Sequence, residues 1–143
     1  MTSEGTPLRL RALDIEDLAV VSSLVQDALV AVGDIAHQPD AARFVLAINR
    51  FRWEAPGDPA LPGERVHSGL RFESVGQVRF RGVDRGRPDR ILSLMAIAYD
   101  AGRAMLHFAD GAAIQLDVDA LHCILEDLDD PWPAQRRPRH RAD

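Results

Sequence analysis

The sequence predicts an α+β fold in which a strongly bent antiparallel sheet or split barrel packs against one N-terminal and one C-terminal helix. Three observations lead to this prediction. Short segments with apolar residues at every second position fill most of the chain, which is typical of antiparallel strands. Turn signals separate these segments. Two stretches with apolar residues at helical spacing bracket them.

The chain begins with a short predicted strand and a predicted helix. Residues 8–13 alternate between leucine or alanine and arginine, as a strand with one solvated face does. Asp14 stands where a helix N-cap is expected, and apolar residues recur at helical spacing from Ile15 onward. We therefore predict a helix over residues 15–27 that lies with its apolar stripe on the sheet.

A hairpin over residues 29–54 is predicted to form the centre of the sheet. Its arms carry Val, Ile and Phe and flank the sequence QPDA at residues 38–41. That sequence favours a turn because proline fixes φ and aspartate binds nearby backbone. In the second arm, residues 43–54, the bulky side chains change parity around Asn49 and Arg50. A β-bulge there explains the change, because one extra residue re-aims every later side chain.

The second half of the chain is predicted to continue the sheet and to end in a helix. A loop rich in proline and glycine spans residues 55–64, and residues 69–83 alternate with a bend or break at Gly76. Apolar residues at helical spacing after Asp119 predict the C-terminal helix, which ends before Pro131. A pleckstrin-homology-like barrel is one architecture with such a closing helix, an analogy that rests on element order alone. Further strands are predicted over residues 91–99, 104–109 and 112–118.

Length and composition indicate a soluble cytoplasmic protein. The chain has 143 residues, which suits one globular domain over residues 1–134 followed by a disordered basic tail over residues 135–143. Its formal net charge of −5 argues against general binding to nucleic acid or to an anionic membrane. The single cysteine fits a reducing cytoplasm, and no apolar run reaches the roughly 20 residues that cross a bilayer.

Four segments of the chain carry a family resemblance. They read LRALDIEDLAVVSSLVQDALVAVGDIA, RFVLAINRFRWE, ILSLMAIAYD and DLDDPWPAQRRPRH. Together they resemble an uncharacterised bacterial family, the domain-of-unknown-function family twenty-nine forty-eight, from about Leu8 to His140. The resemblance implies a bacterial protein with one domain, and it implies no substrate, cofactor or catalytic residue.

The candidate binding surface lies on the predicted central strands. It combines guanidinium groups with aromatic and amide side chains, which can hold a phosphate or a stacked base. An ordinary solvated sheet face is the competing interpretation, because Glu73, Asp84 and Asp89 lie in the same stretch. The candidate residues are Asn49, Arg50, Arg52, Trp53, Arg71, Arg79 and Arg81.

The leading functional hypothesis is a non-catalytic binding or adaptor module, because no catalytic, metal-binding or cofactor-binding motif stands out. We expect no cofactor, and a protein partner or a homo-oligomer rather than nucleic acid or a membrane. The first alternative is a small-molecule enzyme or sensor with a pocket near His107, His122 and Cys123. The second is a weak nucleic-acid binder that uses the arginine residues and the tail.

Overall fold

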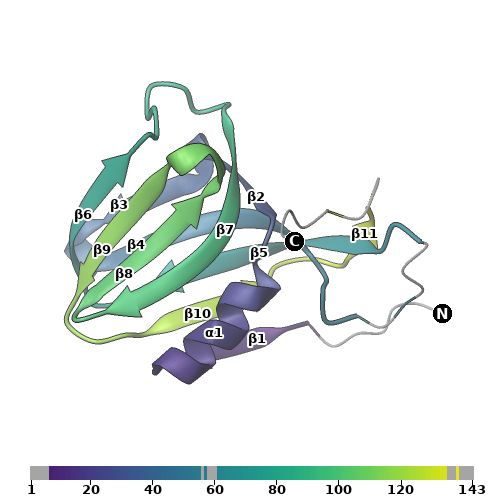
Figure 1. Cartoon of the computed structure of the whole chain (residues 1–143), viewed down its shortest axis with the longest axis horizontal. Coiled ribbons are helices and arrows are strands. Elements are labelled where there is room, and N and C mark those ends of the chain that lie inside the picture. The colour runs from purple at the N-terminus through teal and green to yellow at the C-terminus, as the bar shows by residue number, and fades with distance from the viewer. Residues whose placement is uncertain (1–6, 56, 58–60, 135–137, 139–143) are drawn as a thin grey trace.

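One antiparallel sheet and a single α-helix dominate the part of the computed structural model that is described, residues 7–55, 57, 61–134 and 138 (Figure 1). The helix is α1 (Ile15–Leu24), and the short 3-10 helices are η1 (Val32–Asp34), η2 (Pro39–Ala41) and η3 (Ala109–Gly111). The strands are β1 (Arg9–Ala12), β2 (Ala28–Ala31), β3 (Ile35–Gln38), β4 (Arg43–Phe51), β5 (Glu64–Phe72), β6 (Val75–Arg81), β7 (Ile91–Asp100), β8 (Arg103–Phe108), β9 (Ala113–Val118), β10 (Cys123–Asp127) and β11 (Trp132–Pro133).

The sheet curls on itself without closing. Its strands follow the order β1-β10-β5-β4-β2-β7-β8-β9-β6, with β3 beside β4 and β11 beside β5. Figure 1 shows β6 and β3 on the same side of the molecule. Within the described residues β3 pairs only with β4 and β6 pairs only with β9, so no ladder joins β3 to β6. The predicted antiparallel sheet is therefore confirmed, and it is an open one.

The helix α1 begins where the sequence predicts. Asp14 Oδ1 accepts the backbone N–H of Asp17 at 2.8 Å, which caps the first turn. The helix ends at Leu24, before the predicted end at residue 27. Leu18 and Val21 are its buried side chains, and it packs on β7 and β1. Together with buried side chains of the strands they form one hydrophobic core.

The predicted C-terminal helix is wrong, because this segment forms the strand β10. The strand lies between β1 and β5, so both neighbours satisfy its backbone. Cys123 and Leu125 are fully buried, and Ile124 is buried on the opposite face next to its cross-strand neighbours Arg11 and Arg71. An apolar run that is covered on both faces has no distinctive period, which is why it resembled a helix. The pleckstrin-homology analogy depended on this helix and is not confirmed.

The predicted bulge at Asn49 and Arg50 is also wrong with respect to β5. The register between β4 and β5 is continuous from Phe44 opposite Phe72 to Phe51 opposite Arg65. Arg50 continues the buried face of β4 that begins with Phe44, so the change of parity reflects a buried charge. The predicted turn at residues 38–41 is confirmed as η2 between β3 and β4. The predicted first arm is divided by η1 into β2 and β3, and the second arm ends at Phe51.

The alternating segment at residues 69–83 breaks earlier than predicted. β5 ends at Phe72 and β6 begins at Val75, and Ser74 adopts a positive φ of 58° between them. The break at Ser74, rather than at Gly76, sends the two strands to different places in the sheet.

Across the described residues, no helix has the length and apolar character needed to cross a membrane. The predicted tail, residues 135–143, lies outside the described residues except for Pro138.

Candidate functional site

The residues of the predicted binding surface are spread over three strands and the loop after β4. Asn49 and Arg50 lie on β4 and Arg71 lies on β5, whereas Arg52 and Trp53 follow the end of β4. Arg79 and Arg81 lie on β6, which ends the strand order. Arg71 has Val45 and Ile124 as its cross-strand neighbours, whereas Arg79 lies opposite Gln115 on β9. The structure therefore divides the candidates into a group on β4 and just beyond its end, a residue on β5 and a pair on β6.

Arg50 lies in a buried ionic cluster and is not available to a partner. Its side chain is fully buried, and its Nη1 and Nη2 donate to the carboxylate oxygens of Glu54 at 2.9 and 3.0 Å. Nη2 and Nε also donate to Asp127 at 3.0 to 3.1 Å, and Nε donates to Ser68 Oγ at 3.1 Å. Asp127 accepts the backbone N–H of Leu8 at 3.0 Å as well. The cluster thus joins β4, β5, β10 and the residue before β1.

The charges of this cluster stabilise one another. Burial by itself lowers the pKa of Arg50, but the hydrogen bonds and charges of Glu54 and Asp127 raise it above the ordinary value. Burial likewise raises the pKa of Glu54, and the hydrogen bond and charge of Arg50 bring it below the ordinary value. Two carboxylates therefore occupy the guanidinium, and Arg50 fixes strands rather than recognising a ligand.

Asn49 and Arg52 also contact other parts of the chain. Arg65 Nη1 donates to both the backbone oxygen and Oδ1 of Asn49 at 3.1 Å. Arg52 forms an ion pair with Glu64 and lies 3.7 Å from a carboxylate oxygen of Glu54. These side chains connect β4 and β5 near the loop that joins them, and Asn49 Oδ1 and the Arg52 guanidinium already have partners within the chain.

Trp53 and Arg71 are held in the same way. Trp53 Nε1 donates to the backbone oxygen of Gln26 at 2.9 Å. Arg71 Nε lies 2.7 Å from Glu73 Oε2, and the same carboxylate accepts from Arg43 Nε at 3.0 Å. One carboxylate thus neutralises part of the charge of two arginines on this region of the sheet.

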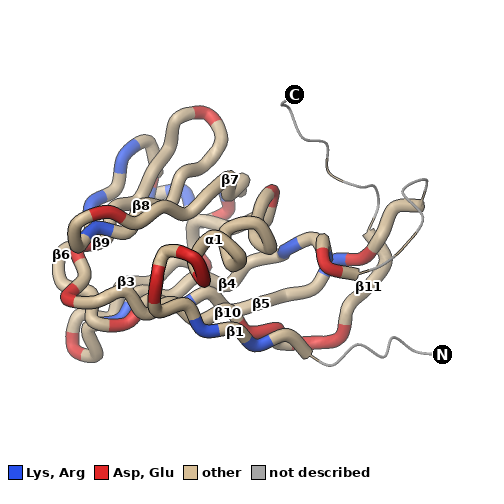
Figure 2. Tube along the Cα trace, turned by 60° about the horizontal axis from the view of Figure 1, so that its bottom comes forward, with Lys and Arg blue, Asp and Glu red and all other residues tan. Residues whose placement is uncertain are grey.

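Residues 79–90, which we name the basic segment, differ from these groups. They read RFRGVDRGRPDR, and their five arginines and two aspartates give a formal charge of +3, against −5 for the whole chain. Figure 2 shows basic positions around β6 and β9. Among the described residues, no carboxylate forms an ion pair with any arginine of the basic segment, namely Arg79, Arg81, Arg85, Arg87 and Arg90.

The basic segment frames a cleft between β3 and β6. This β3–β6 cleft has a volume of about 200 Å³. The guanidinium of Arg85 lies over the ring of Phe80, with Cζ 4.4 Å from the ring centroid. Arg85 lies outside the surface predicted from the sequence, although it follows Phe80 by only five positions. The lining residues are Val32, Gly33, Ile35, Phe80, Val83 and Arg85.

Backbone hydrogen bonds fix the two sides of the cleft. At the start of β6, the Val75 N–H donates to Ala42 O at 2.8 Å, which joins β6 to the end of the β3–β4 turn. Beyond the end of β6, the Gly33 N–H donates to Pro88 O at 2.9 Å. A Cβ at Gly33 would lie only 3.0 Å from Pro88 Cβ, so the loop packs closely on η1. The seam between β3 and β6 is therefore closed at Val75 and open beside Phe80.

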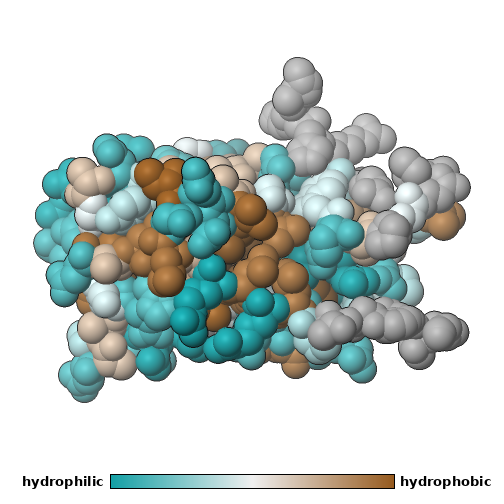
Figure 3. Space-filling model, turned by 90° about the horizontal axis from the view of Figure 1, so that it is seen from below, coloured by the Kyte–Doolittle hydropathy of each residue, from teal (hydrophilic) through white to brown (hydrophobic). Residues whose placement is uncertain are grey.

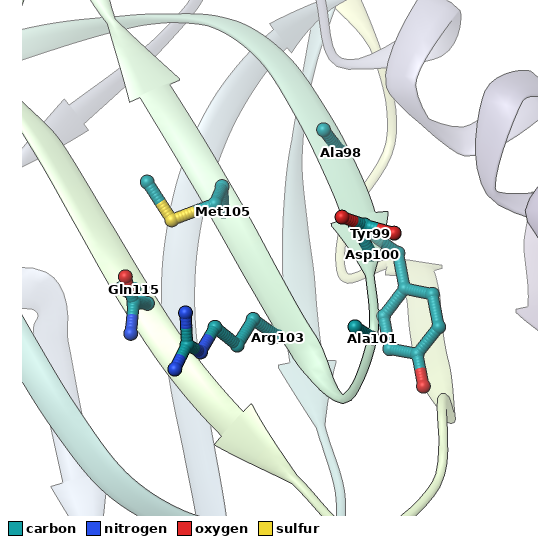
Figure 4. Close-up of a pocket in the computed structure, with 7 residues that line it drawn as sticks. All are labelled: Ala98, Tyr99, Asp100, Ala101, Arg103, Met105 and Gln115. Carbon is teal, nitrogen blue, oxygen red and sulfur yellow. The ribbon is translucent and has the colours of Figure 1, made fainter.

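A second depression, of about 250 Å³, lies at the β7–β8 hairpin (Figure 4). Figure 4 shows Tyr99 pointing to one side of the hairpin, whereas Arg103 and Met105 of β8 and Gln115 of β9 lie on the other side. Arg103 Nε lies 3.9 Å from a carboxylate oxygen of Asp117. Because the polar groups do not converge on one point, this depression is the weaker candidate site.

The predicted pocket near His107, His122 and Cys123 matches neither of these two cavities. Cys123 is fully buried, and burial raises the pKa of its thiol to about 12. A nucleophilic cysteine must be a thiolate, so Cys123 is unsuited to this role near neutral pH. His107 lies on β8, which is not a neighbour of β10 in the sheet. The described residues contain no group of three or more His, Cys, Asp or Glu side chains that could hold a metal ion.

Apolar side chains are exposed on the face that holds α1 and β1. Figure 3 shows hydrophobic residues gathered on this face. Leu13, Ile15 and Val20 are its large exposed hydrophobic residues within the β1–α1 segment. This face lies away from the basic segment, and its residue Val20 provides a control position for the crosslinking experiment in the Discussion.

Comparison with known proteins identifies a family. No curated protein and no solved structure matches the chain. The sequence profile of DUF2948, described as a protein of unknown function, matches residues 8–140. Because this match spans nearly the whole sequence, the chain belongs to the DUF2948 family.

Proposed function

We propose that this protein is a non-catalytic binding module that holds an anionic partner protein at the basic segment and the β3–β6 cleft. The observation that carries the proposal is the absence of carboxylate partners for the basic segment within the described chain. By contrast, Arg43 and Arg71 share Glu73, and Arg50 binds two carboxylates. Guanidinium groups that are not neutralised internally can form bidentate hydrogen bonds to carboxylates of a partner.

The size and lining of the β3–β6 cleft favour binding over catalysis. Sites for small molecules and cofactors usually measure about 300–1,000 Å³. The cleft, at about 200 Å³, is smaller. Its lining is apolar except for backbone groups and Arg85, so it offers no side chain that transfers a proton near neutral pH. These features suit the docking of one or two side chains of a larger partner.

A pair of triple variants tests the proposal. The test variant is Arg79→Gln, Arg81→Gln and Arg85→Gln, and the control is Arg9→Gln, Arg11→Gln and Arg103→Gln. Both remove three exposed positive charges, and the ion pairs lost in the control are exposed and weak. Each immobilised protein is incubated with lysate of the source cells, and retained proteins are quantified by mass spectrometry.

The proposal predicts that the test variant loses at least about tenfold in the amount of an acidic partner that the wild-type protein retains. The control is expected to retain the same partner within about twofold, and both variants should melt near the wild-type temperature. Equal retention by the test variant and the control would show that the basic segment is not the binding surface.

A further inference from the structure

We infer that the partner enters the β3–β6 cleft as an extended strand with alternating apolar and acidic residues, an inference that rests on the proposed function. Added between β3 and β6, this strand pairs its backbone with their free edges. Main-chain hydrogen bonds then provide affinity, and alternate side chains provide specificity. The inference depends on the edges, on the shape of the seam and on the side chains of β6.

The two strands that flank the cleft each have an unpaired edge. β6 pairs with β9 on one side and β3 pairs with β4 on one side, and no other described strand pairs with either. Unpaired N–H and C=O groups on such edges are templates for another strand. The irregular register of β6 lies between Val75 and Val78, at the closed end of the seam. From Val78 to Arg81 the pairing with β9 is regular, so the free edge there is suited to a further strand.

The open part of the seam has the length of a short strand. β3 spans four residues, Ile35–Gln38. On the facing side, the regular part of β6 extends from Val78 to Arg81. The β3–β6 cleft opens between Ile35 and Phe80, with the Val75–Ala42 hydrogen bond at one end of the seam and the Gly33–Pro88 hydrogen bond at the other. An incoming segment of about four residues, at about 3.3 Å per residue, matches the flanking strands.

The side chains of β6 specify the chemistry of the incoming strand. Val78 and Phe80 point inward and are partly buried, whereas Arg79 and Arg81 are exposed on the other face. Side chains directly opposite one another on paired strands lie on the same face and interact. A strand beside β6 therefore places one set of side chains against Phe80, Val83 and Ile35, and the other set against the arginines. Apolar residues suit the first set, and Asp or Glu suits the second.

Synthetic peptides test strand addition directly. The probe is the peptide acetyl-Glu-Val-Glu-Val-Glu-Val-amide. The matched control peptide has the same sequence with an N-methyl group on each valine nitrogen. N-methylation removes backbone donors without changing charge or side chains. A third peptide, acetyl-Glu-Ser-Glu-Ser-Glu-Ser-amide, keeps the charge and removes the apolar groups. Binding to the full-length protein is measured by isothermal titration calorimetry, and amide hydrogen exchange is followed by mass spectrometry.

We expect the valine peptide to bind at least about tenfold more tightly than either control, because each loses several hydrogen bonds or its apolar contacts. Binding should slow amide exchange in β3 and β6. Strand addition would be overturned if the methylated peptide bound as tightly as the valine peptide. If that binding were also lost in the triple variant Arg79→Gln, Arg81→Gln and Arg85→Gln, the proposed function would still stand. Failure of all three peptides, or tight binding of a short single-stranded oligonucleotide in their place, would overturn the inference and assign the arginines another partner.

Discussion

Replacing Arg50 with alanine is expected to lower the free energy of unfolding by about 3–5 kcal/mol, because the substitution leaves the nearly buried carboxylate of Asp127 without its cation. The side chain of Arg50 is fully buried and that of Asp127 is only 7% exposed. Ser68, which donates to Asp127 Oδ1 at 2.8 Å, is fully buried too. The cost is therefore that of an uncompensated buried charge rather than that of one lost hydrogen bond.

Equilibrium denaturation in urea measures this effect, with Arg103→Ala as the control. Arg103 forms a long, exposed ion pair with Asp117. Removing an exposed pair of this kind costs about 0–1 kcal/mol. A loss of similar size in the two variants would contradict the structural role assigned to the Arg50 cluster.

The same cluster makes the free energy of unfolding depend on pH in the acid range. Arg50 holds the pKa of Glu54 below its ordinary value of 4.5, so in acid the unfolded chain binds more protons than the folded chain. This contribution to stability is present above the ordinary pKa and is lost as the pH falls through the folded pKa. In Arg50→Ala the pKa of Glu54 loses its largest lowering contribution, and stability should fall less steeply between pH 5 and the acid limit of folding.

Replacing Phe44 with alanine is expected to lower the free energy of unfolding by about 3–5 kcal/mol, the range for a buried phenylalanine. Phe44 is fully buried on β4. Its ring centroid lies 6.4 Å from that of His37 on β3 and 6.3 Å from that of Phe80 on β6. The residue thus supports both sides of the β3–β6 cleft from within the core.

Urea denaturation and amide exchange of the same variant separate its effects. Leu128→Ala is the control, because that side chain is 60% exposed and its removal should cost little. In Phe44→Ala amide exchange should accelerate more in β3 and β6 than in β1, which β5 and β10 separate from β4 in the strand order. Uniformly faster exchange in all strands would show that Phe44 supports the core without a particular role at the cleft.

The parts of the fold that the sequence predicted correctly are those that short segments determine. Asp14 caps α1 through an interaction with a residue three positions away. The turn at residues 38–41 follows from a proline and an aspartate. Both structures need only local chemistry, so single-sequence reasoning could find them.

The parts that were missed depend on residues distant in the sequence. The segment Cys123–Asp127 is a strand because β1 and β5 lie on its two sides, which its own residues do not indicate. Arg50 shares the parity of Phe44 and Leu46, and that pattern was a signal of a buried charge. The pattern alone could not distinguish a buried arginine from a bulge, because the partners Glu54 and Asp127 that make burial of Arg50 favourable were not known from the sequence.

Sequence periodicity placed Arg79 and Arg81 on one strand face, but it did not indicate the β3–β6 cleft. Arg79 and Arg81 are exposed on β6, as an arginine-bearing face requires. Arg71 lies elsewhere because the chain breaks at Ser74. The cleft brings η1 and β3 beside Phe80 and Arg85, residues about fifty positions apart in sequence, and periodicity carries no information on such a contact.

Site-specific photo-crosslinking tests the central claim most directly. A benzophenone amino acid is placed at Val83 in the β3–β6 cleft, and in a separate protein at Val20, which is 52% exposed on α1. After irradiation in the cells that make the protein, the crosslinked peptides are sequenced by mass spectrometry. The account predicts that Val83, and not Val20, yields an adduct with a partner segment in which apolar and acidic residues alternate. No adduct at Val83, or the same adducts from both positions, would contradict it.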